Sequence, residues 1–387
     1  MSATVRVLHL TRDLPPRAKG GVSTAVGGMT RAQARAGVDV AVVSFDGWRP
    51  KRRRDLGQPP PRPAREGDLA VLRVCAPAEL PAAHAFADAF APDVIHAHHG
   101  MLWEIAETLC DRLGAPGVIH IHVLQSALNA LRGVTERTLS LAGQERALAA
   151  AHRIVAPSEV VARALRQGDP TLTPRLRVAG LGIDDSPAAR AAASAPMARR
   201  GGPIAYVGRF DDVKGIDELF AAVDALAGAL PTARFEIAGG VPDNRRADRR
   251  WRRRWQERAS EDAQARTALL GWLDAEALSG LYARAALLLA PSRYETFGLV
   301  VLEAMLHGVP IAATRAGAVP EVLTHGATGL TSAVGDVDAL VANARALWQD
   351  EDLAARLGAA AADEARARWS WDARAPALLD IYSELQG

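Results

Sequence analysis

The stretch from residue 287 to residue 310 constrains the fold more than any other, because it reads as a buried strand, a turn and a helix. The apolar run Leu287–Ala290 is short and uninterrupted, which is typical of a buried strand in a parallel sheet. A helix is expected from about Phe297 to His307, since Gly308 is placed to end it and Pro310 cannot continue it. The stretch therefore predicts an α/β protein.

Two carboxylates in this stretch, Glu295 and Glu303, occupy positions that favour ligand binding. Glu303 lies on the expected helix among apolar neighbours, and a glutamate is rarely buried without a partner because desolvating its charge is costly. Glu295 lies just before the helix, where backbone N–H groups and the positive end of the helix dipole attract anions. The arrangement suits a ligand with both hydroxyls and phosphates. The alternative is a surface helix that exposes Glu303 to water.

The N-terminal part predicts a parallel sheet with a crossover helix. A strand is expected over Val5–Leu10, a helix from about Ser23 to Ala36, and a second strand over Val38–Phe45. Strand, helix and strand at this spacing form a βαβ unit.

The first connection from strand to helix lacks the fingerprint G-x-G-x-x-G of dinucleotide-binding domains, because it begins Thr11-Arg12-Asp13-Leu14. This argues against a nicotinamide-dependent dehydrogenase. The connection ends in Gly20 and Gly21, which would let the backbone approach a ligand closely. The alternative for this glycine pair is an ordinary flexible loop.

A second α/β domain is expected after a linker over 186–202, which is rich in Ala, Pro and Arg and lacks an apolar period. It opens with a strand over Ile204–Val207, followed by Gly208, Arg209 and, just before the next helix, Lys214. Two cations on a loop between a strand and a helix favour phosphate binding. Lys214 carries added weight because the chain has 3 lysines among 46 basic residues, and a compact ammonium suits phosphate at close quarters.

Two strands of the first domain are expected to end in histidines, one at His96-Ala97-His98-His99 and one at His120-Ile121-His122. Ligands of open α/β sheets bind beyond the carboxyl ends of the strands, so these side chains are expected to line the ligand cleft. Five histidines in two groups also suggest zinc, but no cysteine or acidic side chain has suitable ligand spacing. We therefore predict no metal site.

Composition excludes several classes of protein. The 46 Lys and Arg residues against 44 Asp and Glu leave a formal net charge of +2, which does not point to nucleic acid. Cys75 and Cys110 are too few for a disulfide framework and favour the cytoplasm. The N-terminus shows no leader, and no run approaches the roughly 20 apolar residues of a spanning helix. We expect a soluble protein, with at most a peripheral membrane contact.

Two basic segments carry most of the arginine clusters. The segment from Arg245 to Arg258 would place Trp251 and Trp255 on one face of a helix. One interpretation is an interfacial helix that binds anionic lipid or an anionic acceptor. The second is a helix whose tryptophans pack on its own domain. We favour the second because the patch is short and isolated. The other segment, Trp48–Gly67, predicts an exposed loop.

Four sequence patterns together resemble the retaining glycosyltransferases of family 4 (glycosyl transferases group 1). They are the E-x7-E spacing of Glu295 and Glu303, G-R-F-D-D-V-K-G from Gly208, P-E-V-L-T-H-G-A-T-G-L from Pro320, and K-G-G-V from Lys19. The resemblance covers nearly the whole chain and is strongest from about residue 203.

The resemblance implies the GT-B fold, an α/β fold in which two Rossmann-like domains with parallel sheets face an inter-domain cleft. Residues 1–185 would form the acceptor-side domain and 186–202 the linker. Residues 203–368 would form the nucleotide-sugar side, and a helix over 369–387 would cross back to the first domain.

The resemblance also implies a role for each matching residue. Arg209 and Lys214 would hold the donor diphosphate, Glu295 the hydroxyls of the transferred sugar and Glu303 the ribose. His122 would touch the donor sugar near the anomeric centre. The implied donor-binding residues are Gly20, Gly21, Gly208, Arg209, Lys214, Glu295, Phe297, Gly298, Leu299 and Glu303. The implied catalytic residues are Glu295, His122, Arg209 and Lys214.

The implied reaction needs no metal and no cofactor beyond its nucleoside-diphosphate sugar substrate. A UDP-sugar is favoured and a GDP-sugar comes next; the acceptor would be a hydroxyl of a glycan, a lipid-linked glycan or a small glycoside. No carboxylate is placed as a nucleophile, so same-face attack assisted by the leaving phosphate is the implied route to retention. The chain departs from the family at Leu181, where an asparagine is usual, and at Gly317-Ala318, where a double glycine is common.

Two alternatives stay open from the sequence: a nucleotide-sugar epimerase with the same fold, and a catalytically silent binding partner. Incubation with a donor and no acceptor separates these two from a transferase. A transferase yields free sugar, an epimerase yields an epimer, and a silent binding partner yields nothing.

Overall fold

The computed structural model describes residues 4–17, 20–46, 61–195, 201–240 and 245–386. The chain divides into two compact units, of which one is Met1–Gly182 with Trp371–Gly387 and the other is Ile183–Ser370. Each unit has a mainly parallel sheet with helices on it, which confirms the predicted α/β class with two Rossmann-like domains. None of the described helices combines the length and the apolar character needed to cross a membrane.

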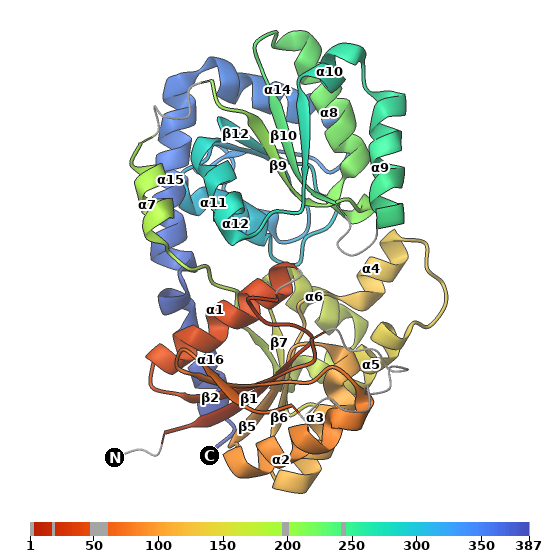
Figure 1. The fold of residues 1–387 in the computed structure, drawn as a ribbon, viewed down its shortest axis with the longest axis vertical. Coiled ribbons are helices and arrows are strands. Elements are labelled where there is room, and N and C mark those ends of the chain that lie inside the picture. Colours follow the sequence, from red (N-terminus) through yellow and green to blue (C-terminus); the bar gives the residue numbers. More distant parts are fainter. Residues whose placement is uncertain (1–3, 18–19, 47–60, 196–200, 241–244, 387) are drawn as a thin grey trace. The chain divides into compact units, whose positions relative to one another are not determined.

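The N-terminal unit is built on one sheet with the strand order β3-β4-β2-β1-β5-β6-β7-β8 (Figure 1). Among the described residues, β3 pairs antiparallel with β4 and the other neighbours are parallel. The strands are β1 (Arg6–Thr11), β2 (Asp39–Ser44), β3 (Ala64–Glu66), β4 (Leu69–Arg73), β5 (Val94–Ala97), β6 (Gly117–His120), β7 (Arg153–Ala156) and β8 (Leu176–Val178).

The two faces of this sheet differ in chemistry because side chains alternate along each strand. Leu8 and Leu10 pack with Trp103 in an apolar core. His9, between them, bonds to Gln33 of α1 and therefore lies on the other face. The helices of this unit are α1 (Gly21–Arg35), α2 (Leu80–Phe90), α3 (Trp103–Leu113), α4 (Gln125–Leu131), α5 (Leu139–Ala150), α6 (Glu159–Gly168) and α16 (Trp371–Ser383).

The C-terminal unit is built on a second sheet with the order β11-β10-β9-β12-β13-β14, parallel throughout the described residues. The strands are β9 (Ile204–Arg209), β10 (Phe235–Gly240), β11 (Thr267–Gly271), β12 (Leu287–Ala290), β13 (Ile311–Thr314) and β14 (Leu330–Ser332). The helices are α7 (Pro187–Ala193), α8 (Ile216–Ala229), α9 (Arg245–Arg258), α10 (Glu261–Ala265), α11 (Ala275–Arg284), α12 (Leu299–Leu306), α13 (Val319–Val322), α14 (Val337–Gln349) and α15 (Glu351–Trp369).

The stretch expected as a linker, 186–202, differs from that expectation. It begins with helix α7, which belongs to the C-terminal unit, where Ala193 lies close against Gly308. The helix forms because Ser186 caps it by accepting from the Ala189 N–H, proline occupies its first turn and alanines follow. Residues 196–200 lie outside the described part of the chain.

The predicted loop over Trp48–Gly67 lies outside the described residues as far as residue 60, and its end contains the short strand β3. The last helix, α16, belongs to the N-terminal unit although it follows α15 of the other unit directly.

The basic helix α9 buries its two tryptophans in its own unit. Trp251 and Trp255 are 8% and 3% exposed, and the Trp255 ring lies 5.0 Å from that of Phe220. Arg254 and Arg258 both pair with Asp217 of α8. The tryptophans are therefore not available for a lipid surface.

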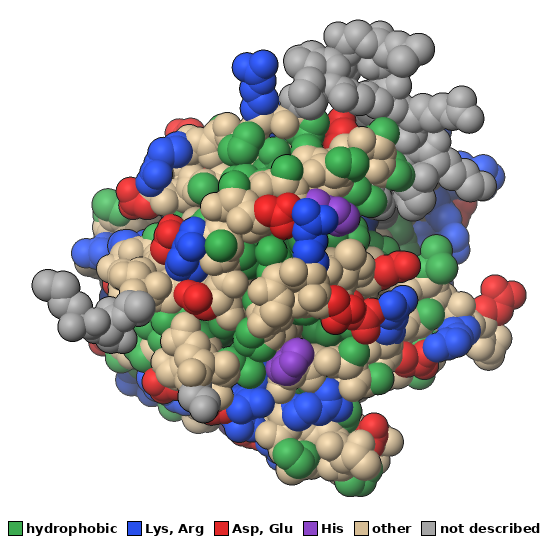
Figure 2. Space-filling view, turned by 90° about the horizontal axis from the view of Figure 1, so that it is seen from below, with side chains coloured by type: hydrophobic (Ala, Val, Ile, Leu, Met, Phe, Trp, Pro, Cys, Tyr) green, Lys and Arg blue, Asp and Glu red, His purple; other side chains and the backbone are tan. Residues whose placement is uncertain are grey.

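On the face shown in Figure 2, basic and acidic side chains are interspersed.

Candidate functional site

The first part of the candidate site is the connection from β9 to α8. Arg209 ends β9 with its side chain half exposed, 3.9 Å from Asp211. The 3₁₀ turn η5 (Asp212–Lys214) follows, and Asp211 caps it by accepting from the Val213 N–H. Both predicted cations thus lie on one short connection at the carboxyl end of a central strand, as the sequence predicted.

The second part is the loop after β12, which is held against the first. Strands β9 and β12 are parallel neighbours, so the loops at their carboxyl ends emerge side by side. The backbone N–H of Tyr294 donates to Val213 O. Gly215 has φ 66°, and a Cβ there would lie 2.0 Å from the Pro291 carbonyl oxygen, so only glycine allows this approach.

This junction joins Lys214 to Glu295. Lys214 Nζ lies 2.6 Å from Glu295 Oε1, and the hydroxyl of Ser292 donates to the same oxygen at 2.8 Å. The two side chains are 22% and 13% exposed. The sequence predicted both residues for the site, but it contains no signal that they form an ion pair. Ser292 was not predicted.

The backbone of Glu295 is held from a third strand connection. Its carbonyl accepts from the Ala318 N–H at 2.9 Å. Gly317 has φ 53°, and a Cβ there would lie 2.0 Å from the same carbonyl oxygen. Ala318 has an ordinary φ of −84°. The glycine that this approach requires is therefore present, and replacing the second glycine of the usual pair by Ala318 removes no backbone freedom that the turn needs.

Helix α12 begins at Leu299, after Gly298, so its free N–H groups lie next to the Glu295 loop. Phe297 is 3% exposed and packs edge to face on Trp369, with ring centroids 5.5 Å apart. The Phe297 side chain is thus part of the core. A role for Phe297 in ligand binding rests on its backbone.

Glu303 lies mostly buried on α12. Its Oε2 accepts a hydrogen bond of 2.8 Å from the Tyr282 hydroxyl on α11. Burial raises the pKa of Glu303 to about 7, and the bond from Tyr282 opposes this shift in part. Tyr282 was not predicted, because nothing in its local sequence marks it as a partner of a carboxylate 21 residues later.

Gly208 lies against another tyrosine that the sequence did not indicate. The Tyr206 hydroxyl donates to the Arg209 carbonyl at 3.1 Å, and a Cβ on Gly208 would lie 2.6 Å from this hydroxyl. Burial, and then the nearby charge of Glu295, raise the pKa of Tyr206. The tyrosine is therefore neutral and fixes the backbone that carries Arg209.

In the N-terminal unit, the glycine pair lies at the start of α1. Gly20 is the N-cap and Gly21 the first helical residue, and Gly20 has no side chain with which to cap this end. Lys19, which precedes them, lies outside the described residues.

The predicted histidines gather on the sheet face that α1 covers. His98 is the centre, because its Nε2 lies 2.9 Å from His9 Nδ1 and its Nδ1 lies 3.0 Å from His122 Nε2. His120 stacks on His122 with centroids 4.2 Å apart. Burial lowers the pKa of His122 to about 3 and that of His9 to about 4, so both rings are neutral near pH 7.

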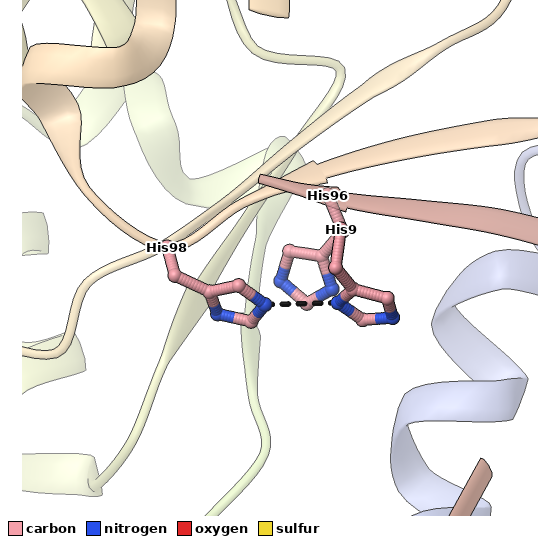
Figure 3. Close-up of side chains that lie close together, drawn as sticks. All are labelled: His9, His96 and His98. Carbon is pink, nitrogen blue, oxygen red and sulfur yellow. Dashed lines mark hydrogen bonds between the residues drawn. The ribbon is translucent and has the colours of Figure 1, made fainter. Parts of the chain in front are cut away.

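Sequence reasoning did not single out His9. The H-x-H spacings at residues 96–98 and 120–122 signal a shared sheet face, but β1 carries only one histidine and no such spacing. Strand β1 is the parallel neighbour of β5, and His9 pairs in register with His96. Figure 3 shows His9, His96 and His98 together.

Two histidine trios offer ligand atoms within 4.8 Å of one another, and neutral imidazole is a common zinc ligand. They are His9, His96 and His98, and His98, His120 and His122. In the first trio His98 is already joined nitrogen to nitrogen to His9 (Figure 3), and in the second trio it is joined in the same way to His122. A metal would require these nitrogens to turn from each other to a common point. The trios therefore suit hydrogen bonding better than metal coordination, and metal-independent transfer stays a prediction.

Comparison with known proteins covers both units. A family described as Glycosyltransferase Family 4 matches residues 19–186, and one described as Glycosyl transferases group 1 matches residues 202–350. The D-inositol 3-phosphate glycosyltransferase of Mycobacterium avium (strain 104) is 32% identical over 305 residues, 75% of this chain and 69% of the relative.

Two solved structures share the fold. Sucrose-phosphate synthase from Thermosynechococcus elongatus has a TM-score of 0.79 at 23% identity, covering 98% of this chain and 99% of the other. Anabaena Alr3699/HepE in complex with UDP-glucose has a TM-score of 0.75 at 19% identity, covering 98% and 100%.

Proposed function

The chain belongs to the glycosyltransferases of family 4 (glycosyl transferases group 1), and we propose that it transfers a hexosyl group from a nucleoside-diphosphate sugar to a hydroxyl acceptor with retention. Its α/β architecture of two Rossmann-like units is the GT-B fold. The chain is accordingly a glycosyltransferase.

The observation that carries the proposal is the Lys214–Glu295 pair at the junction of two strand connections. Negative charge grows on the diphosphate as the glycosidic bond breaks, and fixed cations beside it stabilise that charge. Lys214 and Arg209 supply the cations in this proposal, and the N–H groups at the start of α12 supply dipoles. Glu295, bonded to Lys214 and Ser292, accepts from hydroxyls of the transferred sugar.

Retention is proposed to follow from attack on the face that the diphosphate leaves. Glu295 is already engaged by an ammonium and a hydroxyl, which lowers its nucleophilicity and suits it for orienting the sugar. Lys214 and Arg209 provide the positive charge that a metal ion would otherwise supply, so we propose that transfer is metal-independent and needs no cofactor. In this proposal Glu303 binds the ribose. His122, Gly20 and Gly21 are the residues of the N-terminal unit that contact the transferred sugar.

A UDP-sugar is the favoured donor and a GDP-sugar the next. The Anabaena structure is titled as a complex with UDP-glucose, which makes UDP-glucose the first donor to test. The acceptor is proposed to be a hydroxyl on a glycan, a lipid-linked glycan or a small molecule; the name of the Mycobacterium avium relative makes an inositol phosphate worth including. We propose a cytoplasmic location, since Cys75 and Cys110 form no disulfide.

The test combines binding and turnover. UDP, GDP, ADP and TDP are compared by thermal unfolding, because a ligand at about 100 times its dissociation constant adds roughly 2.7 kcal/mol to the free energy of unfolding. The stabilising nucleotide then selects the donors, which are incubated with and without acceptors. Slow release of free sugar without an acceptor supports the proposal. An epimerised donor would assign the chain to another enzyme class, and no reaction with any donor and acceptor would refute the activity.

A further inference from the structure

The histidine face of the N-terminal unit carries a continuous chain of hydrogen bonds, here called the imidazole chain. Its links are His122 Nε2 to His98 Nδ1 (3.0 Å), His98 Nε2 to His9 Nδ1 (2.9 Å), His9 Nε2 to Gln33 Oε1 (2.8 Å), Gln33 Nε2 to Tyr382 Oη (3.0 Å) and Tyr382 Oη to His96 Nδ1 (2.7 Å). None of these side chains belongs to a residue more than 5% exposed. Water therefore cannot readily replace a missing partner.

The contacts between rings have the geometry of hydrogen bonds. The ring centroids of His9 and His98 lie 5.2 Å apart, the planes differ by 6°, and the joined nitrogens lie 2.9 Å apart. His98 and His122 have centroids 5.2 Å apart and nitrogens 3.0 Å apart. In both pairs the ring centroids lie farther apart than the joined nitrogens by about two ring radii. The two rings therefore meet end to end, nitrogen to nitrogen. Each lone pair then faces an N–H of the next ring.

The direction of every link is coupled to Gln33, whose amide has one accepting and one donating end, so that turning the amide over would reverse all the links together. Its Oε1 accepts from His9, so the hydrogen of this neutral ring is on Nε2 and its Nδ1 must accept from His98 Nε2–H. His98, neutral through burial, then has a bare Nδ1, which accepts from His122 Nε2–H.

The other arm follows in the same way. The amide N–H of Gln33 donates to the Tyr382 hydroxyl, which then donates to His96 Nδ1. His96, also kept neutral by burial, carries its hydrogen on Nε2. Reversing a single link would set two N–H groups or two lone pairs against each other in a dry interior, and a buried hydrogen bond left unmade is costly.

We propose that Gln33 holds the imidazole chain in the direction set by its amide in this structure, Oε1 toward His9 and Nε2 toward Tyr382, so that His122 carries its hydrogen on Nε2 and has an unprotonated Nδ1. Gln33, His9 and His98 are then positioning residues for His122. Within the proposed function, on which this consequence rests, His122 Nδ1, which is buried in this structure, can only accept from a hydroxyl of a sugar that reaches it. A sugar whose hydroxyl is replaced by an acceptor such as fluorine, at the position that meets His122, is therefore a poor donor substrate.

The direction of the chain is tested in the free protein, without any activity. Histidine labelled with ¹⁵N in both ring positions distinguishes protonated from bare nitrogens by NMR at pH 7. We expect the hydrogen on Nε2 in His9, His96, His98 and His122. Hydrogen on Nδ1 of His98 or His122 overturns the proposal. One equivalent of Zn²⁺ is expected to leave the pattern unchanged, and a zinc-induced shift of the His98 nitrogens overturns it as well.

Variants test whether Gln33 is the cause. Gln33→Met removes both ends of the amide and should give a mixture of the two ring forms at His122. Tyr382→Phe breaks the other arm, so it should change His96 and leave His122 as it is. Thr30→Val is the matched control, since Thr30 is fully buried on the same helix and donates to the helix's own carbonyls. It should change neither ring. An unaltered His122 in Gln33→Met refutes the role of Gln33.

Turnover gives the link to function. Gln33→Met should lower kcat about tenfold, the factor that one net hydrogen bond corresponds to, with the donor KM unchanged. Thr30→Val should keep the wild-type kcat. If the predicted ring forms are found in a chain that transfers no sugar, the proposed function fails and the direction of the imidazole chain stands. If transfer is found with the opposite ring forms, the reverse holds.

Discussion

Replacing Lys214 by Met separates what this side chain contributes to stability from what it contributes to transfer. Met keeps the apolar stem and removes the ammonium, so Glu295 keeps Ser292 as a donor and loses the cation at 2.6 Å. Exposed ion pairs contribute about 0.2–1 kcal/mol, and breaking a buried one costs about 3–5 kcal/mol. With side chains 22% and 13% exposed, this pair lies between those cases. We expect the free energy of unfolding to fall by about 1–3 kcal/mol.

The loss of turnover should be larger than the loss of stability explains. Removing one preorganised group that stabilises transition-state charge typically lowers kcat about 10²–10³-fold. The double variant Lys214→Met with Glu295→Gln leaves no uncompensated charge, so it should recover most of the stability of the single variant. It should not recover turnover, because neither the cation nor the carboxylate is restored.

Arg293→Met is the matched control. Arg293 lies on the loop that carries Glu295, and its side chain pairs with Glu218 at 2.6 Å, with exposures of 49% and 8%. Its loss should lower stability by a comparable amount and leave kcat near that of the wild type. Urea unfolding and initial rates at saturating donor measure the two effects. A Lys214→Met variant with near-native kcat, or one no more impaired than Arg293→Met, would refute the assignment of Lys214 to the diphosphate.

Three further predictions concern Glu303, metal ions and the basic helix. Because burial raises the pKa of Glu303 to about 7 from an ordinary value of 4.5, this carboxyl increasingly destabilises the fold as pH rises from about 4.5 to about 7. At pH 8, the free energy of unfolding of Glu303→Gln, measured by urea unfolding, should therefore exceed that of the wild type by up to about 3 kcal/mol. The difference should shrink by pH 5, and a difference that does not vary with pH would contradict this. Transfer should survive EDTA, and activity lost to EDTA and restored by Mg²⁺ or Mn²⁺ would show that a metal is needed. Since the tryptophans of α9 are buried, little binding to anionic vesicles is expected from either the wild type or the triple change of Arg252, Arg253 and Arg254 to Gln; salt-sensitive binding by the wild type alone would show that the helix is interfacial.

Short-range features of the sequence were sufficient for much of the fold. The run Leu287–Ala290 is a strand, and the helix expected from about Phe297 forms as α12, Leu299–Leu306, with Gly308 just beyond its end. These predictions work because a strand, a cap or a turn depends on residues within a few positions of one another. The same reasoning missed α7, because a missing apolar period suggests a linker although Ser186 and the alanines after it start a helix.

Partners in the candidate site depend on contacts that no local pattern encodes. Lys214 and Glu295 are 81 residues apart and meet because β9 and β12 are neighbours in the sheet. Gln33 and Tyr382 are 349 residues apart and meet because α16 belongs to the N-terminal unit.

The sequence by itself determined the residue types of the candidate site: cations at the end of one strand, carboxylates before and on a helix, and histidines at two strand ends. Only the tertiary structure decided which of them share a proton or a charge. Ion pairs and hydrogen bonds act over about 3 Å. Residues far apart in the chain come that close only through the order of strands in a sheet and the helix packed upon it. The Lys214–Glu295 pair and the direction of the imidazole chain are consequences of that packing.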